Sequence, residues 1–448
     1  MRIAVAGGGI SGLVAAYRLR GLLGEAARIT VLEASPRAGG VLYTGELAGG
    51  PVDLGAEAFV GRRPEVPALL GELGLEEQLV TPSGLRPLVW AGGRAHPLPE
   101  RTLMGIPSAA ETLHGLVDAA TLAWVRTEPE RPPTWRVGGD IDVYSLVAER
   151  FGAQVAERSV DPLLGGVYAG SSRSIGVRAA LPTLAAALDR GAASLTAAVR
   201  SVLPPPSTAP VFGGLREGYR VLLEALAARA GADIRTGAAV RSLARTERGW
   251  ALDPIGEVDA VVLATPAPVT ARLLASVAPE ASAAAGAIEL SSSVVVALSL
   301  PGSTELPQNS GVLIGTGEGL RAKAFTLSSR KWPHLAARGG ALVRASFGRF
   351  GDPAPLSWTD EELVTAAVED LRVVTGVPVA PDGFAVQRWP GGLAQYAPGH
   401  TERIAALESG IADLPGLAVA GAYLHGVGVP ACVASGTAAA TRAASVLV

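Results

Sequence analysis

The sequence predicts an α/β fold, α+β overall, in which a parallel sheet is combined with a mixed sheet and a helical insertion. Residues 2–6 form a short apolar run that ends in glycines, which is typical of a buried parallel strand. Apolar residues at helical spacing begin at Ser11, and residues 29–32 form a second apolar run, so one βαβ unit is expected. Strand-like runs at residues 293–300 and 341–347 alternate with turns and predict the mixed sheet.

The other predicted elements follow from the same periodicities. Four segments have apolar residues at helical spacing: 141–151, 178–188, 219–229 and an alanine-rich stretch that runs to the C-terminus. Two further apolar runs, 260–264 and 417–421, predict buried strands. Residues 128–133 combine charges with prolines and predict an exposed linker.

Composition restricts the class of protein. A chain of 448 residues is long enough for two or three domains. The formal net charge of -3, without a dense Lys/Arg run, argues against a nucleic-acid partner. Cys432 is the only cysteine, which excludes an intrachain disulfide and a cysteine-based metal cluster and is compatible with the cytoplasm. We expect no metal site.

No apolar stretch reaches the length of about 20 residues that a spanning helix needs. Residues 112–125 mix apolar and aromatic side chains with His114 and Asp118, and such a helix can lie on a membrane surface. The alternative is a helix packed on its own protein. The expected location is therefore cytoplasmic, with peripheral membrane contact left open.

The loop after the first strand fits the dinucleotide-binding pattern GxGxxG at residues 7–12. In this pattern Gly7 permits the tight turn, Gly9 lets the backbone approach a pyrophosphate, and Gly12 permits close packing of helix and strand. The free N–H groups of the helix start, at Ile10 and Ser11, face the phosphates together with the positive end of the helix dipole.

An acidic residue at the expected spacing supports this interpretation. Glu33 ends the second strand, 21 residues beyond Gly12, where its carboxylate can accept hydrogen bonds from ribose hydroxyls. Such an acid disfavours a 2′-phosphate and hence NADP. Arg37 and a second glycine pair, Gly39 and Gly40, follow directly and suit a loop folded against an extended cofactor, with the guanidinium near the pyrophosphate. These residues favour FAD over NAD.

The C-terminal segment offers a second contact with the cofactor. Gly421 follows a predicted strand, and the turn at Gly428 and Val429 opens a helix that has Pro430 in its first turn. The N–H groups of such a helix start can stabilise negative charge near N1 and O2 of a flavin.

With these residues in place, the chain resembles the FAD-dependent amine oxidase superfamily and, within it, the oxygen-dependent protoporphyrinogen/coproporphyrinogen III oxidases. The resemblance spans nearly the whole chain, and its most specific segments are residues 166–170 (Gly-Val-Tyr-Ala-Gly) and 426–430 (Gly-Val-Gly-Val-Pro). The chain departs from the family at Ser171, Ala422 and Ala431, which puts the fine tuning of the flavin potential in doubt.

The resemblance implies three structural parts. A discontinuous, Rossmann-like FAD-binding domain comprises residues 1–94, 210–270 and 406–448; a helical domain comprises 95–200; and a sheet-based substrate domain comprises 271–405. Ala34 and Val240 are added to the expected cofactor contacts. Arg101, Tyr168 and Gly170 are expected to contact substrate, and the backbone of Gly166 and Gly170 is expected to orient a macrocycle.

The implied reaction is the six-electron oxidation of a porphyrinogen to a porphyrin in haem biosynthesis. It proceeds in three two-electron steps with hydride transfer to flavin N5, and dioxygen is the acceptor that yields hydrogen peroxide. We find no nucleophile–His–acid pattern, and His400 and His425 are expected to be structural or to face solvent.

The arginine- and alanine-rich composition indicates a GC-rich genome, which favours coproporphyrinogen III as substrate. Protoporphyrinogen IX is the close alternative. The more distant alternative functions are an amine oxidase, a carotenoid desaturase and a non-catalytic flavoprotein scaffold that binds haem-pathway enzymes.

Overall fold

The computed structural model describes residues 1–205, 207 and 209–447, so Val448, the last residue of the predicted FAD domain, lies outside it. The predicted βαβ unit is confirmed as β1 (Arg2–Ala6), α1 (Ile10–Leu23) and β2 (Arg28–Leu32). β1 and β2 pair in parallel, and Ala4, Val5 and Ala6 are fully buried. Their apolar character on both faces follows from helices that cover the sheet.

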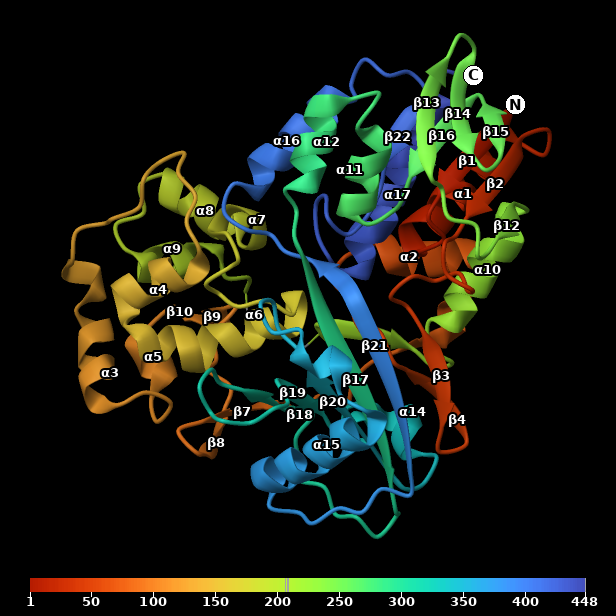
Figure 1. Ribbon diagram of the computed structural model, residues 1–448. Helices are drawn as coiled ribbons and strands as arrows, with labels where there is room; N and C mark the ends of the chain where they lie inside the picture. The colour runs from red at the N-terminus through yellow and green to blue at the C-terminus, as the bar shows by residue number, and fades with distance from the viewer. Residues whose placement is uncertain (206, 208, 448) are drawn as a thin grey trace.

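The βαβ unit is the start of a five-stranded parallel sheet in the order β12-β2-β1-β16-β22 (Figure 1). The added strands come from distant parts of the chain: β12 (Asp233–Arg235), β16 (Ala260–Leu263) and β22 (Leu417–Val419). Helices α10 (Arg220–Ala230) and α17 (Val429–Ala444) pack against α1. The carboxyl ends of all five strands meet at one edge, which is where such sheets bind ligands.

The second sheet has seven strands in the order β21-β17-β20-β19-β18-β7-β8, and its mixed pairing confirms the predicted mixed sheet. Helix α15 (Asp360–Thr375) packs on it and begins with a capping box between Thr359 and Glu362. In chain order the strands are β7 (Leu88–Ala91), β8 (Arg94–Pro97), β17 (Leu290–Leu300), β18 (Gly311–Ile314), β19 (Ala324–Thr326), β20 (Ala341–Phe347) and β21 (Gly383–Ala394).

One segment differs from the predicted division of the chain. The predicted boundary after residue 94 falls inside β8: β7 and Arg94 lie in the range predicted for the cofactor domain and residues 95–97 in that predicted for the helical domain, whereas both strands join the seven-stranded sheet. β7 pairs in parallel with β18, and Val89 and Ala91 are fully buried, so this hairpin gains its apolar contacts from the distant strand. The division into three domains otherwise stays a prediction.

The helical part projects from one side of the two sheets (Figure 1). It contains α3 (Ala119–Arg126), α4 (Val143–Phe151), α5 (Ala153–Val155), a π-helical turn (Ala156–Val160), α6 (Asp161–Tyr168), α7 (Val177–Ala180), α8 (Pro182–Asp189) and α9 (Leu195–Val202). The remaining elements are α2 (Glu65–Leu73), α11 (Ala267–Leu274), α12 (Pro279–Gly286), α13 (Ser328–Lys331), α14 (Pro333–Ala336), α16 (His400–Gly410), β3 (Thr44–Leu47), β4 (Gly50–Asp53), β5 (Phe59–Val60), β6 (Leu79–Val80), β9 (Thr102–Leu103), β10 (Ile106–Pro107), β11 (Phe212–Leu215), β13 (Ser242–Thr246), β14 (Gly249–Asp253) and β15 (Gly256–Val258), with short 3-10 turns at 76–78, 110–113, 128–130 and 354–357.

The prediction that residues 128–133 form an exposed linker is wrong at the first residue, Glu128. Glu128 is fully buried and pairs with Arg150 at 2.8 Å. Its carboxylate also accepts hydrogen bonds from the backbone N–H groups of Leu195 and Thr196 at the start of α9. The charge is therefore neutralised inside the helical part instead of being solvated.

Residues 112–125 do not form one helix. A 3-10 turn ends at Leu113, Gly115 adopts a φ of 80°, and α3 begins only at Ala119, where the Asp118 side chain caps it. Among the described residues no helix is both long and apolar enough to cross a membrane. The cytoplasmic location and the surface contact with a membrane stay predictions.

Candidate functional site

The three motif glycines of the first loop have different surroundings. Gly7 adopts a φ of 105°, and a Cβ added there would lie 2.3 Å from the Ala264 carbonyl oxygen. A Cβ on Gly12 would lie 2.0 Å from the Gly7 carbonyl oxygen. These two glycines are therefore required by the turn and by helix–strand packing inside the protein.

Gly9 is not required by the protein itself. A Cβ added there would meet only the Gly40 Cα, at 3.9 Å, which is an ordinary contact. Gly9 is the N-cap of α1, so Ile10, Ser11 and Gly12 form its first turn. Their backbone N–H groups have no carbonyl of a preceding turn to donate to. The open space above Gly9 fits a phosphate group that approaches the backbone and the helix dipole.

The second glycine pair closes the other side of this space. The Gly39 N–H donates to the Gly8 carbonyl at 2.8 Å, and Gly9 and Gly39 form a parallel bridge. A Cβ on Gly40 would lie 3.2 Å from the Gly9 Cα. The loop of residues 37–40 is thus packed against the glycine loop, as a shared phosphate cradle requires.

Glu33 lies at the end of β2 beside the same loop. One carboxylate oxygen accepts from the Gly8 N–H at 2.7 Å, and the other accepts from the N–H and hydroxyl of Ser35 at 2.8 and 2.7 Å. The Ala238 N–H donates to the Glu33 carbonyl at 2.8 Å and brings the segment that carries Val240 next to Ala34. Glu33, Ala34 and Val240 are therefore brought together at the strand edge.

Arg37 is held more tightly than its predicted role implies. Its guanidinium donates to the carbonyls of Ala38, Gly40 and Leu42 at 2.8–3.2 Å. It lies over the rings of Tyr43 and Trp389, with 4.6 and 5.6 Å to the ring centroids. Burial lowers the pKa of Arg37, although the guanidinium stays charged. Arg37 fixes the shape of the loop and adds positive charge beside it.

The predicted C-terminal contact is built around the start of α17. Gly428 is the N-cap of this helix, and Val429 and Pro430 form its first turn. A Cβ on Gly436 would lie 2.3 Å from the Ser11 carbonyl oxygen, so α17 and α1 touch backbone to backbone. Gly421 adopts a φ of 146° after β22, and its N–H donates to the Ser435 hydroxyl at 2.9 Å. These contacts join the C-terminal glycines to the first helix.

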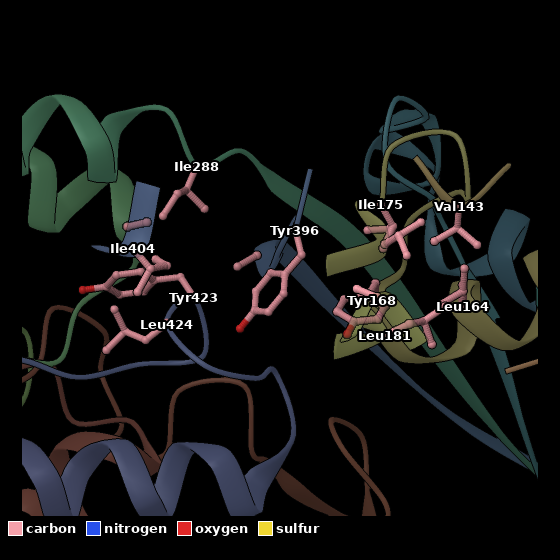
Figure 2. Packing of buried hydrophobic residues seen from close by; sticks show 14 of the residues in the cluster. Val143, Leu164, Tyr168, Ile175, Leu181, Ile288, Tyr396, Ile404, Tyr423 and Leu424 are labelled. Atoms are coloured by element: carbon pink, nitrogen blue, oxygen red, sulfur yellow. The ribbon is translucent and has the colours of Figure 1, made fainter. Parts of the chain in front are cut away.

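Tyr396 links the α17 loop to the helical part. Figure 2 shows its ring between the group of Ile288, Ile404, Tyr423 and Leu424 and the group that contains Tyr168. The Tyr396 and Tyr168 ring centroids are 5.6 Å apart, and His400 stacks on Tyr396 at 3.9 Å. His400 is buried and its pKa is lowered to about 4, so the imidazole is neutral and packs as an aromatic ring.

The segment of residues 166–170 lies at the end of α6. Gly166 is exposed and a Cβ there would meet nothing within 4 Å, whereas Tyr168 and Gly170 are buried. The Tyr168 carbonyl accepts from Gln395 Nε2 at 2.8 Å. Burial raises the pKa of Tyr168 to about 12, which keeps its hydroxyl neutral. The open backbone face of the segment is therefore at Gly166.

Arg101 lies directly before the β9–β10 hairpin and outside the glycine loops of residues 7–12 and 37–40. It is exposed and adopts a φ of 51°, and its carbonyl accepts from the Ser108 hydroxyl at 2.6 Å. The hairpin packs closely on the turn before α6, since the Ser159 hydroxyl donates to the Gly105 carbonyl at 2.7 Å. Arg101 and the segment 166–170 are thus connected through one helical unit.

A partly buried charge cluster at Glu57 was not among the predicted sites. Its carboxylate lies 3.2 Å from both Lys331 Nζ and an Arg344 guanidinium nitrogen, and it accepts from Trp332 Nε1 at 2.8 Å. Burial opposes ionisation, but Lys331 and Arg344 outweigh it and lower the pKa of Glu57 to about 2.

The fold and this arrangement define a flavoprotein oxidoreductase. Residues 10–444 match the family described as flavin containing amine oxidoreductase. The chain belongs to this family, whose cofactor is a flavin.

The chain's relatives indicate which enzymes of this family it is most similar to. The chain is 53% identical to the coproporphyrinogen III oxidase of Mycobacterium tuberculosis (strain ATCC 25618 / H37Rv), over 98% of this chain and 96% of the relative. It is 28% identical to the coproporphyrinogen III oxidase of Bacillus subtilis (strain 168), over 99% and 98%. A crystal structure from Exiguobacterium sp. 255-15, named provisionally as a protoporphyrinogen oxidase, superposes with a TM-score of 0.86 at 28% identity, covering 98% of this chain and 97% of that chain. The predicted fold class and family resemblance are confirmed.

Proposed function

We propose that this chain is an FAD-dependent oxidase that converts coproporphyrinogen III to coproporphyrin III, with dioxygen as acceptor and hydrogen peroxide as co-product, in porphyrin and haem biosynthesis. The observation that carries the substrate is the 53% identity, over almost the full length, to a coproporphyrinogen III oxidase. Protoporphyrinogen IX stays the alternative substrate.

The geometry of the parallel sheet supports FAD as the flavin. The space above Gly9, bounded by Gly40, suits a pyrophosphate, and Glu33 lies where a ribose would follow it. The start of α17 at Gly428 suits the flavin ring. The cradle thus has a place for each part of a dinucleotide, whereas a mononucleotide would leave Glu33 without a ligand.

The chain's own side chains bind and orient in this proposal. When bound, the flavin supplies the hydride acceptor for each two-electron step. Gly166 gives an open backbone face to the macrocycle, and the neutral rings of Tyr168 and Tyr396 provide an apolar wall. Arg101, which is exposed beside the β9–β10 hairpin, stays a predicted contact of a propionate. The pyrrole protons leave to water, so the reaction needs no buried base.

The test follows porphyrin fluorescence in air with purified protein and, separately, coproporphyrinogen III and protoporphyrinogen IX. Spontaneous oxidation is measured without protein. We expect faster emission from coproporphyrinogen III and three hydrogen peroxide molecules per porphyrin. Preference for the dipropionate would move the assignment to protoporphyrinogen IX. A yellow protein that exceeds the control with neither substrate would reject the proposal.

The identity of the flavin is tested independently of turnover. Heat-released cofactor from the purified protein is separated by chromatography against FAD and FMN standards. FAD is expected in a ratio of about one per chain, as one cradle of this kind holds one dinucleotide. FMN would contradict the role given to Glu33.

A further inference from the structure

A polar cavity lies in the seven-stranded sheet, outside the glycine loops of residues 7–12 and 37–40 that are proposed to hold the flavin cofactor. Its volume is about 130 Å³, and its walls are the loop between β18 and β19 and the residues just after β20. Three basic side chains line it, Arg321, Lys323 and Arg349, and of these Arg321 is already paired with Asp370 and Glu369. We propose that this cavity is a carboxylate subsite in which Lys323 and Arg349 bind one propionate of the porphyrinogen. This proposal rests on the proposed function.

Among the described residues neither cation is neutralised by a direct ion pair, although Lys323 is buried and Arg349 is partly buried. Lys323 is only 8% exposed, and its Nζ donates to the Gly348 carbonyl at 2.8 Å. Arg349 donates to the Thr316 hydroxyl at 3.3 Å and to the Ile314 carbonyl at 3.2 Å. Within the part of the chain that the structure describes, neither side chain has a carboxylate within 4.0 Å. Buried cations are normally paired, so this pair calls for an anion.

The acidic groups around the cavity already have other partners. Asp161 accepts hydrogen bonds from the Ser172 N–H and from the Thr316 hydroxyl. Glu318 accepts from the N–H groups of Gly92 and Gly93.

The other two charged groups that line the cavity do not neutralise Lys323 either. Arg321 pairs with Asp370 and Glu369. Asp352 is exposed and, like Asp161, acts on Arg349 at longer range. Lys323 therefore faces a like charge, Arg349, and no acid of its own.

The cavity adjoins the segment proposed to hold the macrocycle. The Phe350 N–H, next to Arg349, donates to the Ala169 carbonyl at 2.7 Å. On the opposite wall, the Thr316 hydroxyl binds Asp161, the first residue of α6. The cavity is thus attached to both ends of α6, the helix that carries Gly166 and Tyr168.

The size of the cavity fits an arm and not a whole ligand. Sites for complete small molecules span about 300–1,000 Å³, and this cavity is well below that range. A propionate brings one negative charge and two oxygens, which match an ammonium and a guanidinium. The cavity would favour coproporphyrinogen III where the arm that it receives is a propionate that protoporphyrinogen IX lacks.

The test measures binding and does not depend on turnover. Flavin-loaded wild type, Lys323→Met and Arg349→Met are titrated with the stable product coproporphyrin III, followed by porphyrin fluorescence. Arg245→Met on the exposed β13–β14 hairpin removes the same charge far from the cavity and is the matched control (Figure 1). We expect roughly 10- to 100-fold weaker binding for each cavity variant, as for loss of a charged hydrogen bond, and unchanged binding for the control.

The outcomes separate the two proposals. Wild type that does not bind coproporphyrin III would reject the proposed function. Wild type that binds, with both cavity variants within twofold of it, would reject the subsite alone. If Arg349→Met does not fold, Lys323→Met decides, because methionine is close in shape and removes a buried charge. A free anion is the competing occupant of the cavity. If glutarate raises the melting temperature of wild type but not of Lys323→Met, and does not weaken coproporphyrin III binding, the propionate assignment is wrong.

Discussion

The hydroxyl of Tyr396 ties together two sides of the loop that precedes α17. It accepts a hydrogen bond from the Gly426 N–H at 2.7 Å and donates one to the Ala422 carbonyl at 2.8 Å. Both partners lie in the stretch between β22 and the helix start at Gly428. Tyr396 therefore fixes the backbone that is proposed to meet the flavin ring.

Replacement of Tyr396 by phenylalanine should weaken flavin binding. The change leaves the Gly426 N–H and the Ala422 carbonyl, both part-buried, without this partner, and a lost hydrogen bond of this kind costs about 1 kcal/mol. We expect a lower melting temperature and a flavin dissociation constant raised roughly tenfold, measured by reconstitution of the apoprotein. Tyr144→Phe is the control, since its hydroxyl bonds Glu157 at the helical part. Equal flavin affinity in Tyr396→Phe and wild type would remove Tyr396 from the site.

Gly9→Val should abolish flavin retention without unfolding the protein. Gly9 has a φ of -70° and only Gly40 near its added Cβ, so the chain tolerates a side chain there. The branched side chain would instead fill the space assigned to the pyrophosphate. We expect a colourless protein with near wild-type secondary structure by circular dichroism.

Two other glycine substitutions are the controls for Gly9→Val. Gly21→Ala, in α1 with nothing within 4 Å of its Cβ, should stay yellow and gain up to about 1 kcal/mol of stability. Gly12→Val should fail to fold, because its Cβ would lie 2.0 Å from the Gly7 carbonyl oxygen. A yellow, fully loaded Gly9→Val protein would show that the phosphate site lies elsewhere.

The elements that sequence alone predicted are those with local causes. The βαβ unit follows from an apolar run, a glycine turn and helical spacing that all lie within 32 residues. The prediction of an exposed linker is wrong at Glu128 because proline and charge describe only the local chain. The partner that buries Glu128, Arg150, lies 22 residues further on, and no local pattern pairs them. The place of the β7–β8 hairpin in the seven-stranded sheet has the same kind of cause, since its partner β18 lies far along the chain.

Glu128 should contribute strongly to stability. Burial opposes its charge, but hydrogen bonds from Thr196 and Arg150 and the α9 backbone outweigh burial and lower its pKa. Glu128→Gln leaves Arg150 buried without a counter-charge, and we expect a loss of about 3–5 kcal/mol in urea unfolding at neutral pH. Glu100→Gln, at an exposed pair with Arg86, should cost less than about 1 kcal/mol.

The pH dependence of Glu128→Gln identifies the cause. A lowered pKa gives stability that is present above the unfolded-state pKa, near 4.3, and is lost as the pH falls. The difference between wild type and Glu128→Gln should therefore shrink as the pH falls below about 4. A difference that stays constant across this range would point to packing instead of charge.

The candidate subsite shows a different limit of sequence analysis. Lysine occurs only at positions 323 and 331, among 38 lysine and arginine residues; Lys323 is buried and Lys331 is partly buried beside Glu57. This rarity was visible but carried no spatial information. Arg349 joins Lys323 only because the Lys323 N–H pairs with Ser346 at the end of β20. The pairing of strands, and not any motif, creates the cavity.

Lys323→Met should make the flavin-loaded protein more stable while it weakens porphyrin binding. Burial, with a smaller effect from Arg349, lowers the pKa of Lys323 from 10.5 to about 7. Between these values the unfolded chain binds more protons than the folded one, so this group costs stability below about pH 7 and the cost disappears as the pH rises toward 10.5. The variant should therefore exceed wild type by a few kcal/mol at about pH 6 and by much less at about pH 9, in chemical unfolding without porphyrin. Loss of stability in Lys323→Met at about pH 6 would mean that Lys323 is a structural residue, whose positive charge is already satisfied by the protein and is not held ready for a ligand.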